Sequence, residues 1–354
     1  MLVPDPGADR EAFVEAVERA TRAVGPSAII PVHDGSIEAL RAHRSRFPQL
    51  ALASEAALDV ATSKARTYAA AMEIGIRVPT SMAVSNSDEL RTALAELGAP
   101  LVVKPDRSWY WSRDRGMRVA PGVGTDRRSA EQLAAAIWDV GGSVELQEVL
   151  PGRREAVSLM RAGGRIRARF AQAAERTLPP LGGASITRRS ITFPPDAGEI
   201  ALRLVEAIDL DGYSEVEFRR AGDGEPVLME VNPRLSASVE VAVRAGVDFP
   251  AMVYAWVAGD ALEAVDGYEV GVRMRWLGGD IARLRSALAN PEQVDVHPRA
   301  EELRAFVGDF ARRTGYDYVA NDDLKPAVRA FASATGRASH EIAARLAARG
   351  PVRG

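Results

Sequence analysis

Two segments that alternate in the manner of β-strands, Tyr213–Phe218 and Pro226–Asn232, flank the turn-forming run 221–224 and predict a β-hairpin. Glu217 lies in the first segment and Glu230 in the second. Carboxylates that face one another across a strand pair are destabilising unless a cation or a fixed basic group lies among them. This hairpin therefore constrains the fold strongly, because it demands positive charge at a defined place.

The register decides which side chains meet. If Glu217 lies opposite Glu230, then Glu215 lies opposite Asn232, and Glu230 and Asn232 share one face because they are two residues apart. Mg²⁺ prefers such oxygen ligands and is usually held by one or two carboxylates together with substrate phosphates. We interpret Glu217, Glu230 and Asn232 as a magnesium site, with Mn²⁺ as the other candidate ion, and Arg234 as a group that grips a phosphoryl oxygen. The alternative is an ordinary solvated hairpin whose charges face water.

Lysine is rare in this chain, where arginine supplies nearly all the positive charge. It occurs only at Lys64, Lys104 and Lys325. Lys104 follows the apolar run Leu101–Val103, and a compact, flexible ammonium at that point suits contact with a nucleotide phosphate. The alternative is a compositional bias toward arginine that left three lysines by chance.

Composition narrows the class of protein. The 354 residues, 47% hydrophobic and 26% charged, are enough to bury a substantial core and predict two or three subdomains. The formal net charge of −3 argues against nucleic-acid or anionic-membrane partners, and the absence of cysteine excludes disulfides and thiolate chemistry. No apolar stretch reaches membrane-spanning length. We therefore expect a cytoplasmic protein with small-molecule substrates, for which a homodimer is possible.

Helix and strand signals alternate along the chain. Helices are expected at about 9–24, 36–47, 63–73, 130–138 and 196–208, with another that ends at Leu97, and strands at 28–32, 80–84, 101–104, 143–148, 156–160, 165–171 and 186–193. Residues beyond about 262 predict a helical tail with one strand-like piece near 270–276. The pattern indicates a fold of α/β and α+β class.

Several motifs, in their order and spacing, resemble the ATP-grasp superfamily. They are Lys64, Leu101–Pro105, Leu146–Gly152, Glu155, Glu217 and Met229–Arg234. The similarity covers about residues 28–258 and is strongest to the carbamoyl-phosphate-synthase-like branch and its carboxylate–amine ligase relatives.

The resemblance implies an ATP-grasp fold with a definite division of the chain. A partial pre-ATP-grasp α/β domain is expected at 1–62, an ATP-grasp domain at 63–262 and a mostly helical C-terminal extension at 263–354. Within the ATP-grasp domain, the small ATP-binding subdomain would cover 63–150 and the metal and substrate subdomain 151–262. Relatives usually open on a strand, whereas this chain opens on a helix, so we expect that a first βα portion is missing.

The resemblance also implies roles for individual residues. Lys104 would contact the α- and β-phosphates of ATP, and Lys64 would be a second phosphate-side lysine. The hinge that recognises adenine would be formed by Glu148, Val149 and Leu150, and Glu155 would accept hydrogen bonds from the ribose hydroxyls. Mg²⁺ would be held by Glu217, Glu230 and Asn232, and Arg234 would steady the γ-phosphoryl group or acyl phosphate. In this family a substrate carboxylate attacks the γ-phosphate to give an acyl phosphate, which an amine captures. The alternatives are an ATP-binding regulatory or scaffold protein without turnover, and a phosphotransferase.

The sequence allows two interpretations for each of two loops. The loop that begins at Gly182–Gly183 either presents Arg188 to a substrate carboxylate or is a plain turn with solvated arginines. The loop 107–117 stands where many relatives have a glycine-rich phosphate cover, yet it keeps only Gly116. Its arginines, Arg107, Arg113 and Arg115, either replace amide donors under a lid formed by Trp109 and Trp111, or the aromatic residues simply pack the loop down.

Overall fold

The structure is a computed structural model that describes residues 2–112, 115–180, 183–220, 224–289, 298–320 and 322–330. The chain divides into two compact units. The first comprises Met1–Ala173 and Ser190–Val270, and the second comprises Ala174–Arg189 and Gly271–Gly354. The domain boundaries expected at residues 62 and 262 stay a prediction. Arg113, Gly182 and most of the expected hairpin turn, residues 221–223, lie outside the described residues.

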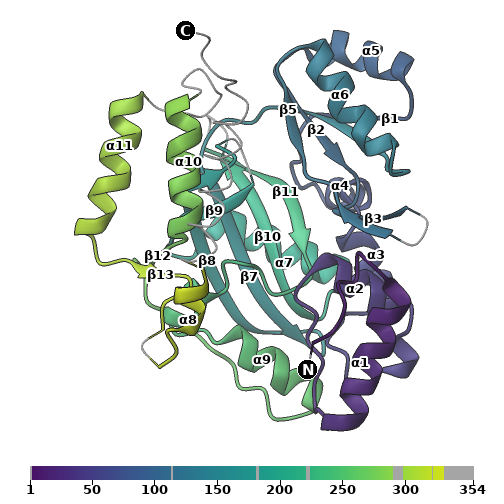
Figure 1. Ribbon diagram of the computed structural model, residues 1–354, viewed down its shortest axis with the longest axis vertical. Helices are drawn as coiled ribbons and strands as arrows, with labels where there is room; N and C mark the ends of the chain where they lie inside the picture. Colours follow the sequence, from purple (N-terminus) through teal and green to yellow (C-terminus); the bar gives the residue numbers. More distant parts are fainter. Residues whose placement is uncertain are drawn as a thin grey trace, which may run out of the picture. The chain divides into compact units, whose positions relative to one another are not determined.

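The elements of the first unit are shown in Figure 1. Its helices are α1 Arg10–Val24, α2 Asp34–Arg41, the 3-10 helix η1 Arg44–Arg46, α3 Glu55–Ala61, α4 Lys64–Glu73, α5 Ser87–Leu97, α6 Arg127–Trp138, α7 Pro195–Ala207, α8 Glu240–Arg244 and α9 Phe249–Ala258. Its strands are β1 Ser81–Val84, β2 Leu101–Pro105, β3 Trp109–Ser112, β4 Arg115–Arg118, β5 Gly122–Gly124, β6 Val144–Glu148, β7 Arg154–Ala162, β10 Gly212–Arg220 and β11 Pro226–Asn232. Strands β8 Arg165–Leu178 and β9 Ala184–Ser190 each run from one unit into the other along the chain.

The N-terminal segment is helical rather than layered α/β. Asp9 caps α1 by accepting a hydrogen bond from the backbone N–H of Ala12, as its place before an apolar-periodic run predicts. The strand expected at 28–32 is wrong, because only an isolated parallel bridge joins Ile29 to Leu50. Pro31 has no N–H to donate, so a strand ladder cannot continue through it.

A small antiparallel sheet with the order β1-β6-β2-β5 follows. Helices α5 and α6 cover one face, where Leu101, Val103 and Leu146 belong to a buried apolar cluster (Figure 1). Side chains alternate along a strand, so Lys104 and its cross-strand partner Glu145 point to the other face. The helix-free face of this sheet therefore presents a lysine and a carboxylate rather than core residues.

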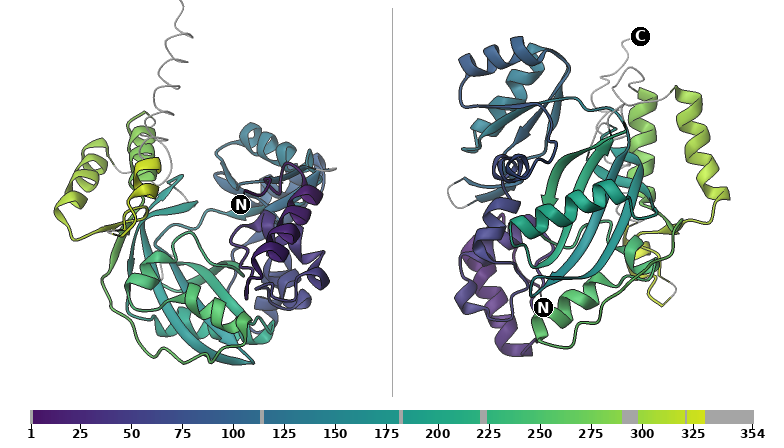
Figure 2. Two further views of the ribbon diagram at one scale, coloured as in Figure 1. Left: turned by 60° about the horizontal axis from the view of Figure 1, so that its bottom comes forward. Right: turned by 180° about the vertical axis from the view of Figure 1, so that it is seen from behind.

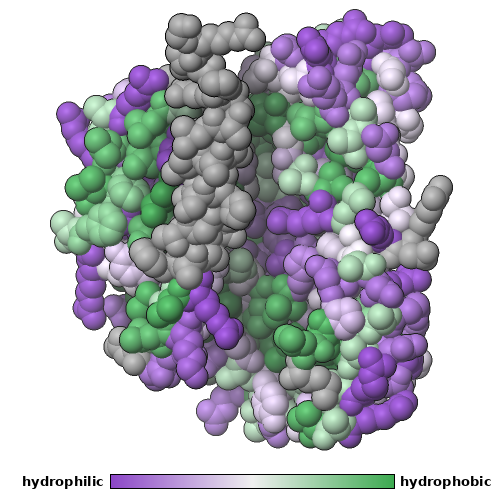
Figure 3. Space-filling model, viewed as in Figure 1, coloured by the Kyte–Doolittle hydropathy of each residue, from purple (hydrophilic) through white to green (hydrophobic). Residues whose placement is uncertain are grey.

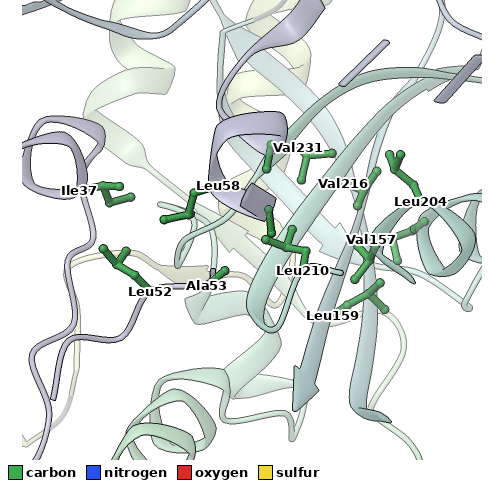
Figure 4. Packing of buried hydrophobic residues seen from close by; sticks show 14 of the residues in the cluster. Ile37, Leu52, Ala53, Leu58, Val157, Leu159, Leu204, Leu210, Val216 and Val231 are labelled. Atoms are coloured by element: carbon green, nitrogen blue, oxygen red, sulfur yellow. The ribbon is translucent and has the colours of Figure 1, made fainter. Parts of the chain in front are cut away.

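A larger sheet has the strand order β11-β10-β7-β8 within the first unit, and its neighbouring strands there are antiparallel. Helix α7 lies across one face of it, as the right-hand view of Figure 2 shows. Leu204 of α7 packs there with Val157 of β7 and Val216 of β10, and the same cluster continues to Leu58 of α3 (Figure 4). Burial of this face fixes which residues of β7 and β10 point away from α7.

The second unit contains strands β12 Arg273–Arg275 and β13 Gly315–Tyr316, helices α10 Leu277–Ala289 and α11 Arg299–Gly308, and the 3-10 helix η2 Asp309–Ala311. Strand β12 pairs with β9 and with β13. Figure 3 shows apolar side chains on the surface of α11, where Leu303 and Val307 are exposed. The helical character expected for this region is confirmed in α10 and α11, and the strand-like piece is shorter than expected.

The fold class predicted from the sequence is confirmed, as a mixed α/β and α+β architecture. None of the helices in the described ranges is long and apolar enough to span a membrane.

Candidate active site

The β10–β11 hairpin has the predicted register next to its acidic residues. Glu217 lies opposite Glu230, and Glu215 lies opposite Asn232. Just beyond, the register shifts, since Phe218 pairs with Leu228 and leaves Met229 as an extra residue. The carbonyl of Met229 accepts a 2.8 Å hydrogen bond from the hydroxyl of Tyr68 on α4. This bulge, which the sequence pattern does not reveal, fastens the hairpin to α4 beside the acidic pair.

The pKa values of the two facing carboxylates are shifted in opposite directions. Burial raises the pKa of Glu217 to about 7, and Glu230 and Glu215 add to this against the opposing effect of Arg154. Burial also raises the pKa of Glu230, but Lys64, Lys104 and Arg154 outweigh it and hold this pKa below its ordinary value. One carboxylate is therefore ionised and the other is near its midpoint at neutral pH. A divalent cation between them would stabilise the ionised form of both.

Arg154 is a site residue that the sequence analysis missed. It lies on β7, and its guanidinium donates to Oε1 of Glu217. Burial lowers the pKa of Arg154, but Glu217, Glu230 and Glu215 more than compensate and raise it. In a chain where arginine is the default cation, no composition signal separates this half-buried arginine from solvated ones. Its place beside Glu217 follows only from the pairing of β7 with β10.

Asn232 and Arg234 continue the site at the end of β11. The amide nitrogen of Asn232 lies 3.3 Å from Oε1 of Glu217 and 3.4 Å from Oε1 of Glu230, and its amide oxygen lies 3.5 Å from Nη2 of Arg234. Arg234 is ion-paired with Asp34 at the start of α2. The amide of Asn232 must turn over before its oxygen can join the two carboxylates around a metal ion.

Lys64 and Lys104 reach the hairpin from two different elements. Lys64 opens α4, and Asp106, just after β2, holds that helix end by accepting hydrogen bonds from the hydroxyl of Ser63 at 2.9 Å and from the N–H of Ala65 at 2.9 Å. The ammonium of Lys64 also lies 3.5 Å from the carbonyl oxygen of Asp106. The joint between β2 and α4 thus brings both lysines toward Glu230, whose pKa they lower.

Lys104 is buried and sits among mixed charges. Burial lowers its pKa to about 8, Lys64 adds to this, and Glu230 and Glu217 oppose it. A lysine with a depressed pKa beside two carboxylates is typical of a functional site, because an ordinary surface lysine would keep its charge at far higher pH. Lys104, Lys64, Glu217 and Glu230 are therefore brought together electrostatically, as their order in the sequence led us to expect.

The expected adenine hinge lies at the end of β6. The N–H of Thr80 donates a 2.8 Å hydrogen bond to Oε1 of Glu148, and the N–H of Glu148 donates to the carbonyl of Thr80. Val149 and Leu150 follow directly, and Leu150 is buried. Glu148 therefore already holds the neighbouring strand β1 in place, and the adenine-binding role of these three residues stays a prediction.

Glu155 lies apart from the acidic hairpin residues. It is paired with Phe218 across β10, so it points to the α7 face of the sheet, whereas Glu217 points to the opposite face. It is 1% exposed, and Arg153 and Arg220 form ion pairs with it. Its expected role toward ribose stays a prediction. In the structure its carboxylate also holds Arg153 and Arg220 in ion pairs.

Arg188, expected to grip a substrate carboxylate, lies on β9 in the second unit. Only 1% of it is exposed, and its two terminal nitrogens donate to Asp317 at 3.1 and 2.7 Å. The reading of this segment as a turn with solvated arginines is wrong for Arg188, because its guanidinium is buried in a bidentate ion pair. A substrate carboxylate would have to displace Asp317, so a catalytic role for Arg188 is not one that we propose.

The aromatic loop forms the short hairpin β3–β4, packed against the N-terminal segment. The ring of Trp109 meets the ring of His33 edge-on with centroids 5.3 Å apart, and it fills the space beside Gly35 and Gly116. Arg107 donates to Asp59 at 2.9 Å. Between the two interpretations of this loop, the structure has Trp109 packing it down rather than standing open as a lid.

A cavity of about 40 Å³ lies beside the hairpin, lined by Lys64, Thr67, Arg107, Trp109, Glu230 and Asn232 among others. It is large enough for water but not for a nucleotide. Within the described ranges, no three Asp, Glu, His or Cys side chains form a metal-binding group. The donor set is thus two carboxylates and one amide, which suits Mg²⁺ when phosphate oxygens and water complete its coordination.

Sequence comparison matches residues 146–279 to the family described as ATP-grasp in the biosynthetic pathway with Ter operon. No protein of curated function matches the chain significantly.

Solved structures share the fold at low sequence identity. A biotin carboxylase from Campylobacter jejuni, in complex with β,γ-ATP, is 16% identical, with a TM-score of 0.58 over 74% of this chain and 62% of that one. The biotin carboxylase domain of 2-oxoglutarate carboxylase from Hydrogenobacter thermophilus, with MgADP and bicarbonate, is 13% identical, with a TM-score of 0.59 over 75% and 61%. An L-amino acid ligase from Bacillus licheniformis is 16% identical, with a TM-score of 0.51 over 70% and 60%.

This chain spans about three fifths of the length of the biotin carboxylases it matches. Residues 146–279 match an ATP-grasp family model, and the fold shared with these structures shows that the chain has an ATP-grasp fold.

Proposed function

We propose that the protein is an ATP- and Mg²⁺-dependent ligase that activates a substrate carboxylate as an acyl phosphate and passes the acyl group to an amine. The observation that carries the proposal is the opposition of Glu217 and Glu230 across the hairpin, with Lys64 and Lys104 close enough to Glu230 to lower its pKa. Binding of a nucleotide alone does not need two facing carboxylates, whereas a bridged triphosphate does.

The residues divide the work by charge. Glu217, Glu230 and, once turned over, the amide oxygen of Asn232 would hold Mg²⁺, which when bound neutralises charge on the phosphates. Lys104 and Lys64 supply ammonium groups on the phosphate side, and Glu148, Val149 and Leu150 offer a strand end for adenine. Arg154 keeps Glu217 oriented, and Asp34 orients Arg234 in the same way. Catalysis of this kind is mainly positioning and charge stabilisation.

The reaction balances in two steps. A carboxylate oxygen attacks the γ-phosphorus, the bond to the β-phosphate oxygen breaks, and ADP leaves. The amine nitrogen then attacks the acyl carbon, a carbon–nitrogen bond forms, the carbon–oxygen bond to phosphate breaks, and inorganic phosphate and one proton are released.

The test is a screen of carboxylates and amines, amino acids included, for ATP consumption in the presence of Mg²⁺, with ADP and phosphate measured separately. The expected result is ADP and phosphate formation that requires both a carboxylate and an amine. Formation of ADP with a phosphorylated acceptor and no free phosphate would instead show a phosphotransferase.

One observation favours a second candidate, a nucleotide-binding protein without turnover. The hairpin β3–β4, at the place of the phosphate-covering loop of relatives, has few glycines and is held down by Trp109. Tight ATP binding with no acceptor-dependent ADP in the screen would establish this candidate and exclude the ligase.

A further inference from the structure

A second polar cluster lies on the same sheet face as the acidic pair, one step along the strands. Glu215 precedes Glu217 by two residues on β10 and is paired with Ser158 of β7. Gln172 of β8 and Ser238, in the segment after β11, complete what we call the Glu215 cluster. Residues two apart on a strand share a face, about 7 Å from one another. The cluster is thus a neighbour of the proposed metal site but separate from it.

Every hydrogen bond that the structure gives Glu215 side-chain oxygens arrives at the same atom, Oε2. The donors are Nε2 of Gln172 at 2.9 Å, Oγ of Ser238 at 3.4 Å and Oγ of Ser158 at 3.5 Å. In the described part of the chain these partners are all neutral, although Glu215 is only 3% exposed. A buried carboxylate without a cation in contact is costly, so a positively charged partner would fit at Oε1.

Gln172 gives an independent indication of a ligand. Its side chain is 5% exposed, and its Oε1 has no hydrogen-bond partner among the described residues. The amide is held the right way round, because Nε2 donates both to Glu215 and to Oγ of Ser238 at 2.7 Å. A buried carbonyl oxygen that lacks a donor is rare in folded proteins, and here it belongs to the same cluster as Oε1 of Glu215, to which none of the described residues donates.

The nearby guanidinium groups of Arg154 and Arg234 form hydrogen bonds to other carboxylates, although both also interact electrostatically with Glu215. Arg154 bonds to Glu217, and Arg234 bonds to Asp34. Around Glu215 the acceptor set is one carboxylate oxygen, one amide oxygen and serine hydroxyls, which matches a compact monocation that carries several N–H donors. Mg²⁺ fits less well, because it is usually held by carboxylates together with substrate phosphates.

We propose that the Glu215 cluster binds the amine substrate in its protonated form, as a primary ammonium group or the ammonium ion, beside the place where the acyl phosphate forms. The inference rests on the proposed ligase function and names the substrate class that its second step uses. Glu215 Oε1 and Gln172 Oε1 accept N–H donors from the ammonium. Before attack the nitrogen releases one proton to water. Its lone pair then forms the carbon–nitrogen bond, the carbon–oxygen bond to phosphate breaks, and a second proton leaves the nitrogen as the amide forms.

The kinetic test compares Glu215→Gln with the native protein, using the carboxylate and amine that the screen identifies. The isosteric substitution should raise KM for the amine roughly tenfold to a hundredfold, with KM for ATP and for the carboxylate within about twofold, because a hydrogen bond to a charged group is lost. Hydroxylamine, which is uncharged at neutral pH, should trap the acyl phosphate equally well in both proteins. Ser238→Ala, which removes one neutral donor, should show a smaller change in the same direction.

Glu240→Gln is the matched control, since Glu240 is an α8 surface carboxylate that pairs with Arg244. Its kinetic constants should equal those of the native protein. Equal KM values for the amine in Glu215→Gln and Glu240→Gln would overturn the proposal, and so would loss of hydroxylamine trapping in Glu215→Gln, because that would place Glu215 in acyl phosphate formation.

A crystallographic test does not depend on turnover. Crystals soaked in rubidium chloride, with Rb⁺ as an anomalous-scattering analogue of ammonium, should show a peak between Glu215 and Gln172 that Glu215→Gln abolishes. No peak there, or a Mn²⁺ peak at Glu215 in a parallel soak, would overturn the proposal even if the ligase activity is established. Conversely, a Rb⁺ peak in a protein that the screen shows to lack turnover would leave the monocation site in place and refute the ligase instead.

Discussion

At the scale of single residues, removal of the Glu230 carboxylate should abolish most of the activity while it leaves the stability of the protein nearly unchanged. Its ionised form is favoured by Lys64 and Lys104, and it is only half buried. Glu230→Ala should lower turnover roughly a hundredfold or more, because a preorganised charge at the reacting phosphates is lost. The circular dichroism spectrum should stay unchanged and Tm should fall by only a few degrees.

Glu240→Ala, a surface carboxylate-to-alanine change in the same unit, should keep full activity. Turnover that persists in Glu230→Ala would remove this residue from the mechanism.

Lys104 predicts a pH dependence of nucleotide binding. Its pKa in the folded protein is about 8, below the ordinary value, so the free protein loses this ammonium as pH rises through 8. A bound phosphate favours the ammonium, and the affinity for ADP should therefore be flat below 8 and fall above it, by up to about tenfold per pH unit. The sign for stability is opposite: the unfolded chain holds the proton more tightly, so deprotonation of the folded state makes this group less destabilising above 8.

Isothermal titration of ADP without metal ions, in the native protein and in Lys104→Arg, tests this dependence. Arginine stays charged throughout, so any binding that the variant retains should not change across the same range. The same decline in both proteins would assign the pH dependence to another group.

The site could be predicted from the sequence only where backbone pairing alone decides the geometry. The pairing of β10 with β11 brings Glu217 opposite Glu230 as expected, although this register is reached only through the extra residue Met229, which period-two alternation from the turn does not predict. Arg154 could not be found in this way, because its neighbours on β10 are some sixty residues distant in the chain. Asp34, which binds Arg234 from α2, is farther still, and no local pattern encodes such a pair.

At the scale of elements, the docking of β3–β4 against the N-terminal segment depends on glycines. A Cβ on Gly35 would lie 2.7 Å from the ring of Trp109. Gly35→Ala should destabilise the protein by about 1–3 kcal/mol through overpacking, although alanine is the better helix former in α2. Chemical denaturation measures the change in the free energy of unfolding.

A double-mutant cycle with Trp109→Leu identifies the cause. With the large ring removed, Gly35→Ala should cost far less than it does in the native background. Additive effects of the two substitutions would show that Trp109 does not fill the space beside Gly35.

Element prediction succeeded where capping and periodicity agree. Asp9 caps α1, which matches the helix expected at 9–24, whereas α6 begins at Arg127, after its cap Asp126, and so starts before the expected residue 130. The prediction of a strand at 28–32 was wrong. The apolar run there has the composition of a strand, but Pro31 has no backbone N–H to donate to a neighbouring strand. The hairpin β3–β4 was read only as a loop, since its pairing is stabilised by contacts of Trp109 with Gly7 and Gly35 from a distant part of the chain.

At the scale of the whole molecule, the two units have cores of different chemistry. The first has a large aliphatic cluster, whereas in the second the fully buried side chains include those of Arg188 and Arg275. The Arg275 guanidinium is fully buried, lies 4.6 and 4.4 Å from the rings of Phe306 and Phe310, and donates at 2.7 Å to Asp280. A chain that uses arginine almost everywhere on its surface thus uses it as a core residue too, and composition alone does not distinguish the two uses.

Arg275→Lys should therefore destabilise the second unit selectively. A lysine ammonium is not planar, so it cannot contact both aromatic rings and still hydrogen-bond to Asp280 as the guanidinium does. The buried ion pair is therefore broken, at a cost of about 3 kcal/mol in the free energy of unfolding. Arg312→Lys, which changes an exposed arginine of the same unit that pairs with Asp309, is the matched control and should change stability little.

Two units with separate cores predict two calorimetric transitions. Arg275→Lys should lower the temperature of one transition, and MgADP should raise that of the other. If both transitions move together in either experiment, the units unfold as one, and the separation of their cores does not extend to their stability.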